Sequence, residues 1–141
     1  MTSFDDVIAL FLSKITTFEE FLNLTEEELS EEFTIALKSA MAKFINKKDI
    51  VADYDTRTFN RNLTDLEQEI ISLGMVLAWV TPKVNNIELM KPMLSSKDYT
   101  VFSQANHLKE MKEMKSIAEN DFHYWSNRYI LKGVMESQGD N

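Results

Sequence analysis

The chain has 141 residues, of which 15 are basic, 23 are acidic and none is cysteine, so its net charge is −8. This length suits one domain, and the lack of cysteine excludes disulfides and thiolate metal sites. The acidic balance disfavours a free-standing nucleic-acid binder, because phosphate contacts need a basic surface. Three glycines and two prolines leave few positions for tight turns, so we expect a compact all-α fold.

The first two predicted helices begin at polar residues that can cap them. Ser3 precedes an apolar stripe that runs from Phe4 to Ile15 at spacings of three and four residues, which is typical of a half-buried helix. A short apolar helix or turn is expected over residues 17–24. Thr25 and Glu28 then form a capping box, which opens a second long helix with a buried face that ends at Phe44.

An extended loop is predicted over residues 47–62, where no helical stripe is present. We expect a structured loop, with room for one short strand or turn. Loops of this length are uncommon in compact domains unless they have a function, so this loop is a candidate contact element. Its candidate assembly contacts are the aromatic and basic side chains that look exposed in the sequence: Tyr54, Arg57, Phe59 and Arg61. Nucleic-acid contact through its basic residues is a weaker alternative.

The central helix is predicted over about residues 65–81 and contains the apolar run IISLGMVLAWV, from Ile70 to Val80. Thr64 and Glu67 form a second capping box, and the helix is expected to end at Pro82. The run is about half the length that a membrane-spanning helix needs. It therefore predicts a core helix surrounded by other helices, with a partly exposed assembly surface as the alternative. A further short helix is expected to begin at residues 85–86 and to end before residue 92.

The last predicted element is a helix over about residues 97–131, which ends near Gly133. At about 1.5 Å per residue it would be roughly 50 Å long, whereas a compact chain of this size is less than about 40 Å across. The helix should therefore extend past its own domain, or bend near Asn120. An extending helix needs a partner for its apolar stripe, so the candidate contacts are Met111, Met114, Phe122, Trp125 and Tyr129. Residues 1–132 form the expected domain, and residues 133–141 a flexible polar tail.

No residue pattern in the chain predicts an active site. His107 and His123 make no catalytic or metal-binding pair with their neighbours, and the acidic loop residues lack the glycine and the final glutamate of a calcium loop. We therefore expect no enzymatic activity, no cofactor and no metal. The N-terminal segment MTSFDDVIALF has aspartates where a signal peptide has basic residues, so we expect a soluble protein without an export signal and without membrane contact.

Several stretches of the chain resemble a family of small head–tail connector, or neck, proteins of tailed bacteriophages of Gram-positive hosts. The resemblance covers about residues 4–129. It is carried by FDDVIALFLSKIT, by LKSAMAKF and above all by LTDLEQEIISLGMVLAWVTPKVNNIELMKPMLSSKDYTVFSQANHLKEM. Its most distinctive parts are the WVTPK turn, from Trp79 to Lys83, and the SKDY and SQAN segments that follow.

The resemblance implies a virion structural protein that forms a homo-oligomeric ring between the portal protein and the tail. The expected partners are further copies of the chain, the portal protein and adjacent neck or tail proteins, in the virion neck and, during assembly, in the host cytoplasm. Genomic DNA would pass through the ring without sequence-specific contact, and acidic side chains in the lumen would repel its backbone. The alternatives are a small phage-encoded regulatory or anti-defence protein that binds a host protein, and an accessory factor in nucleic-acid processing.

Overall fold

The computed structural model of the protein describes residues 1–15, 24–44, 47–90 and 98–139, with the side chains of 86–106 and 137–139 excepted. The fold is all-α, as predicted, apart from two very short strands. The elements are α1 (Phe4–Lys14), α2 (Glu26–Lys43), β1 (Ala52–Asp53), β2 (Thr58–Phe59), α3 (Asp65–Met90) and α4 (Asp98–Gly139). The short element expected over residues 17–24 lies almost wholly outside the described residues.

The predicted helix caps at the N-termini of α1, α2 and α3 are all present. The hydroxyl of Ser3 accepts a hydrogen bond from the backbone N–H of Asp5 (3.2 Å), and that of Thr25 accepts one from Glu28 (3.2 Å). The hydroxyl of Thr64 accepts a hydrogen bond from the backbone N–H of Glu67 (3.1 Å). These bonds satisfy N–H groups that have no partner within the first turn of a helix.

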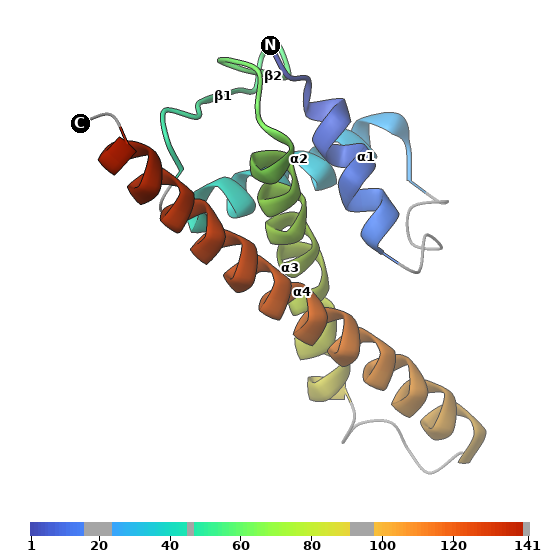
Figure 1. The fold of residues 1–141 in the computed structure, drawn as a ribbon. Helices are drawn as coiled ribbons and strands as arrows, with labels where there is room; N and C mark the ends of the chain where they lie inside the picture. The colour runs from blue at the N-terminus through green and yellow to red at the C-terminus, as the bar shows by residue number, and fades with distance from the viewer. Residues whose placement is uncertain (16–23, 45–46, 91–97, 140–141) are drawn as a thin grey trace.

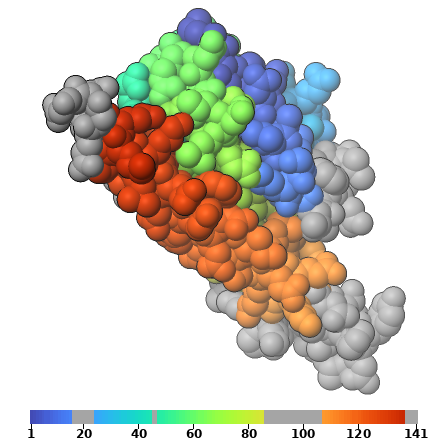
Figure 2. All heavy atoms as spheres, viewed as in Figure 1, coloured from blue at the N-terminus to red at the C-terminus, as the bar shows by residue number. Residues whose placement is uncertain are grey.

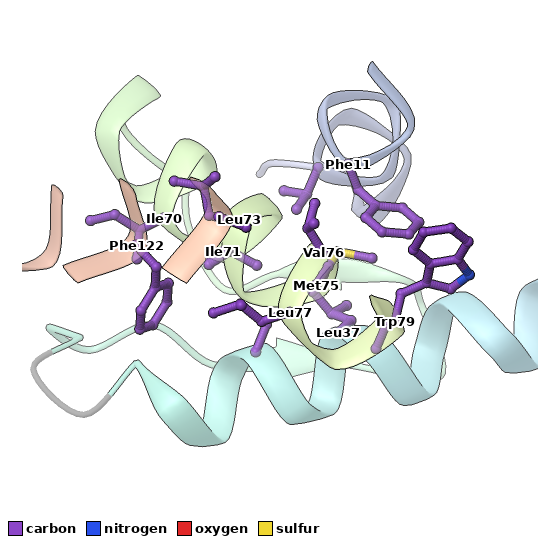
Figure 3. Close-up of a cluster of buried hydrophobic side chains, with 14 of the residues drawn as sticks. Phe11, Leu37, Ile70, Ile71, Leu73, Met75, Val76, Leu77, Trp79 and Phe122 are labelled. Carbon is purple, nitrogen blue, oxygen red and sulfur yellow. The ribbon is translucent and has the colours of Figure 1, made fainter. Parts of the chain in front are cut away.

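Helix α3 lies at the centre of the molecule and packs against α1, α2 and α4. Figure 3 shows this arrangement around the apolar run: Phe122 comes from α4, Leu37 from α2 and Phe11 from α1. Every residue from Ile70 to Val80 is buried, apart from the partly exposed Ala78. The prediction of a core helix surrounded by other helices is therefore confirmed.

The predicted end of α3 at Pro82 is wrong, because the helix continues through Pro82 to Met90. A proline inside a helix removes one backbone hydrogen bond and costs about 3 kcal/mol. Here the ring of Pro82 is exposed, while Val80 and Val84, two residues before and after it, are buried. This burial holds both segments against the core and offsets the loss. The separate short helix expected after Pro82 is accordingly absent, since residues 85–90 belong to α3.

Helix α4 is continuous from Asp98 to Gly139, with no break near Asn120, so the alternative of a bend is wrong. It also continues past Gly133, where the sequence predicted its end. Its 42 residues correspond to a length of roughly 63 Å. Figure 1 shows α4 running antiparallel to α3, so that the two helices extend together beyond α1 and α2.

Candidate assembly surfaces

The predicted loop over residues 47–62 contains a small hairpin. Strands β1 and β2 are antiparallel, with Ala52 opposite Phe59 and Asp53 opposite Thr58. In the turn, the carboxylate of Asp53 accepts hydrogen bonds from the N–H groups of Asp55 (3.0 Å) and Thr56 (3.2 Å). These bonds, chiefly those from the backbone of Thr56 and then Asp55, lower the pKa of Asp53. Arg57 follows with φ of 58°, which closes the turn.

The hairpin is attached to the N-terminus of the chain. The N–H of Phe4 donates to the carbonyl of Arg57 (3.0 Å), and the N–H of Phe59 donates to the carbonyl of Thr2 (2.9 Å). The side chain of Phe59 is fully buried and packs on Phe4, with 5.0 Å between the ring centres. The expectation that Phe59 is exposed is therefore wrong. The alternation of residues in this short hairpin points its side chain inward, beneath α1.

The other three candidate contacts of the loop, Tyr54, Arg57 and Arg61, also contact other residues of the same chain. Tyr54 is partly exposed, and the Lys38 ammonium lies 4.7 Å from the centre of its ring. The Arg57 guanidinium donates to the Ser30 hydroxyl (2.9 Å). Burial raises the pKa of Tyr54. The loop thus contributes to the body of the domain, and of its candidates Tyr54 and Arg57 keep the larger share of surface for a partner.

Arg61 and Glu67 form an ion pair at the point where the loop meets α3. The two nitrogens Nη1 and Nη2 of Arg61 donate to the two carboxylate oxygens of Glu67, at 2.8 Å and 2.6 Å. Arg61 also donates to the carbonyls of Lys48 and Asn62, both at 3.1 Å. The Glu67 side chain is only 2% exposed, whereas that of Arg61 is 27% exposed. The pair therefore joins both ends of the loop to the start of α3.

Tyr129 connects this ion pair to α4. Its hydroxyl donates to Glu67 Oε2 (2.8 Å) and accepts from the backbone N–H of Lys48 (3.4 Å). Its ring packs against Phe44 at the end of α2, with 5.2 Å between the ring centres. Tyr129 thus belongs to the intramolecular core, and only a small part of it is exposed for the contact with another molecule that the sequence predicted.

The electrostatics of this network fix the protonation states of its members. Burial raises the pKa of Glu67, but the hydrogen bonds from Arg61, Thr64 and Tyr129 outweigh burial and lower this pKa to about 2. Burial, followed by the hydrogen bond to Glu67, raises the pKa of Tyr129 to about 12. A carboxylate that is already bonded to three groups is poorly suited to proton transfer, so the network is structural.

The apolar stripe predicted on α4 is divided between the core and the surface. Met111 and Phe122 are buried within the chain, so little of either predicted contact is left on the surface for a partner. Phe122 lies against the middle of α3, where its ring is 3.4 Å from the position that a Cβ atom on Gly74 would take. Met114 and Trp125 are partly buried and pack against the core, so only part of each is available to another molecule.

A different side of α4 carries large apolar side chains that are open to solvent. We call it the outer stripe: Ile117, Tyr124, Leu131 and Met135, which are 63%, 53%, 57% and 71% exposed. Sequence reasoning missed this surface because it followed the stronger stripe on the buried side. The spacing of seven residues from Ile117 through Tyr124 to Leu131 is the signal that could have found it.

A groove of about 500 Å³ lies beside the outer stripe, where α1, α3 and α4 meet. Figure 2 shows this face of the molecule, with α4 in orange and red across the front and α3 and α1 next to it. Leu73, Val76 and Met114 contribute apolar side chains to the groove. Its carboxylates are Glu69, Glu110, Glu113 and Asp121. Among the described residues that line it, the cation is Lys14, which lies 2.6 Å from Glu69.

Among the residues that the structure describes, no three acidic or histidine side chains are grouped closely enough to hold a metal ion. In the same residues, no helix has the length and apolar character needed to cross a membrane. The surfaces described above are therefore the candidate sites that the geometry offers.

No protein-family model, curated protein sequence or solved structure matches this chain.

Proposed function

We propose that this chain is a non-enzymatic structural protein of a bacteriophage virion, a subunit of the head–tail connector that links the portal to the tail. The observation that carries the proposal is the resemblance of the segment from Leu63 to Met111 to neck proteins of tailed phages. This segment includes the whole of α3 and the first third of α4. It therefore contains the core helix α3 and the N-terminal part of α4.

The exposed surface of the chain supports an assembly role. The outer stripe places four large apolar side chains on one side of α4, and monomeric proteins seldom leave such side chains together without a function. The groove beside it adds further apolar surface with carboxylates around it. An assembly subunit would cover both surfaces in the finished particle.

The net charge of −8 suits a protein that surrounds DNA without binding it. Carboxylates that face a narrow passage repel the phosphate backbone, so the genome can move through without adhering. In this proposal the chain forms a homo-oligomeric ring, its neighbours are the portal and other neck or tail proteins, and its place is the virion neck.

The test uses a phage that encodes this chain. Mass spectrometry of purified particles should find the chain in a fixed ratio to the portal protein. Particles made without the chain should be filled heads that lack tails, and supplying the wild-type chain in trans should restore them. If complete particles contain none of the chain, and it is recovered bound to a host protein, then the regulatory alternative is correct and the connector proposal is wrong.

A further inference from the structure

The outer stripe has its own chemistry, which differs from that of the buried side of α4. Successive residues of a helix are about 100° apart. The four members of the stripe therefore lie within about 40° of one another around α4. Asp121 and Arg128 fall within or beside the same band, and Lys132 borders it. The side that packs on α3 and α2, with Met111, Phe122 and Tyr129, is turned away by about 120°.

The charges on this side are separated along the helix. The half nearer the N-terminus of α4 has the groove with its carboxylates, and Asp121 lies at the edge of that groove. The half nearer the C-terminus has Arg128 and Lys132 next to Leu131 and Met135, and the nearby carboxylate of Glu136 is paired with Lys48. One half therefore offers an acidic apolar groove, and the other half offers a basic apolar surface.

From this complementarity we propose that the outer stripe binds a second copy of the chain, with the two α4 helices antiparallel about a twofold axis near residue 126. In this register Ile117 of one copy faces Met135 of the other, and Tyr124 faces Arg128. Asp121 of each copy then lies between Arg128 and Lys132 of the other. Of the carboxylates that line the acidic groove, Asp121 is the one that this register brings to the basic side chains of the partner.

Twofold symmetry repeats each stabilising contact in the interface. Every apolar and ionic contact occurs twice, as an isologous interface requires. Tyr124 and Arg128 also lie at the centre of the interface, where tyrosine and arginine contribute most to binding. Within one chain the Arg128 guanidinium already lies 5.9 Å from the centre of the Tyr124 ring, so the cation is held near the aromatic face that it would meet in the pair. This pairing concerns the purified chain, and it does not depend on the proposed place in the virion.

Charge reversal tests the pairing in the full-length protein. Sedimentation velocity at increasing concentration should show a wild-type species with twice the mass of one chain. Asp121→Lys alone, or Arg128→Glu combined with Lys132→Glu, should each weaken dimerisation at least tenfold, because like charges then face each other at both ends. Mixing these two variants should restore the dimer, and so should combining all three substitutions in one chain.

A matched control separates this effect from a general change of charge. Lys109→Glu alters an exposed residue that lies beyond the paired part of α4, because in this register its counterpart would be position 143, and it should leave dimerisation unchanged. Circular dichroism should report the same helix content for every variant, since all the altered side chains are exposed. A wild-type chain that stays monomeric overturns the proposal. So does a dimer that survives either of the two charge-reversal variants.

The orientation can be tested separately because the chain has no cysteine. A mixture of the Ile117→Cys and Met135→Cys variants should form a disulfide between the two different chains on mild oxidation. Each variant alone should form far less. If Ile117→Cys instead forms a disulfide with itself more readily than with Met135→Cys, then the helices are not antiparallel in this register and the proposal is wrong.

Discussion

Glu67 is an ionised side chain in the interior, and it is stabilised by two partners that belong to other parts of the fold. Arg61 comes from the loop, and Tyr129 comes from the last third of α4. An ionised group in the interior is tolerated only when its lone pairs are satisfied. The three residues therefore hold the loop, α3 and α4 in one relative arrangement.

We expect Glu67→Gln to lower the free energy of unfolding by about 2–3 kcal/mol. The estimate is at the low end for a broken buried pair because Arg61 keeps some contact with water. Chemical denaturation measures the change. Glu69→Gln is the matched control: it lies on the same helix but breaks the more exposed ion pair with Lys14, and should cost no more than about 1 kcal/mol. Equal losses in the two variants would show that the network has no special role.

The same carboxylate predicts a dependence of stability on pH. Its pKa is lowered from 4.5 to about 2 in the folded protein. Its contribution is therefore complete above about pH 4.5 and is lost as the pH falls toward 2. The full difference corresponds to about 3 kcal/mol. Denaturation curves between pH 6 and pH 2 should fall less steeply for Glu67→Gln than for the wild-type chain. Parallel pH profiles would exclude Glu67 as a cause.

At the scale of the elements, two glycines in helices have opposite roles. A Cβ atom on Gly74 would lie 2.8 Å from Ala40 Cβ and 3.1 Å from Ala40 Cα, so α2 and α3 approach closely only because this side chain is missing. A Cβ atom on Gly133 would meet only the end of the flexible Lys48 side chain, at 2.9 Å from Nζ.

We therefore expect Gly74→Ala to destabilise the fold by about 1–3 kcal/mol, since the backbone of α2 must move. Gly133→Ala should be neutral or stabilising by up to about 1 kcal/mol, because alanine favours the helix and the lysine can swing away. Thermal unfolding of the two variants, measured side by side, shows whether each substitution raises or lowers the stability of the fold. A tolerated Gly74→Ala would mean that α2 and α3 have room to separate.

The sequence was sufficient to predict the elements whose signals are local. The caps at Ser3, Thr25 and Thr64, and the burial of the run from Ile70 to Val80, follow from spacing within one turn or one helix. The continuation through Pro82 was missed because burial on both sides of the proline, a tertiary effect, outweighs its local preference. The burial of Phe59 and Tyr129 was missed for a similar reason. Nothing in the spacing of Glu67 and Tyr129, which are 62 positions apart, predicts that they meet.

At the scale of the whole molecule, α3 is the element on which the others depend. It contacts α1, α2 and α4. In contrast, the side chains described after Tyr129 in α4 are mostly exposed, and an exposed ion pair joins Glu136 to Lys48. Local opening follows the density of buried contacts. Stability should therefore fall from the centre of α3 toward the C-terminal end of α4.

Hydrogen exchange followed by mass spectrometry measures this gradient. Amides of residues 70–80 should exchange slowest, at rates set by global unfolding, and amides after residue 130 should exchange at least about tenfold faster. The comparison is made on the wild-type chain at a concentration too low for dimers to form. Equal protection of the two segments would mean that α4 unfolds only together with the core.

The central position of α3 also affects the order of events during synthesis. The ribosome completes the apolar run at Val80 before it makes the α4 residues that cover one side of it, such as Met111 and Phe122. At about 5–20 residues per second, the roughly 40 residues in between take some 2–8 s. For that time the nascent chain has α1 and α2 available to cover α3, but its third side stays bare. A chaperone that binds apolar segments would find its target in the growing chain and lose it as soon as α4 is complete.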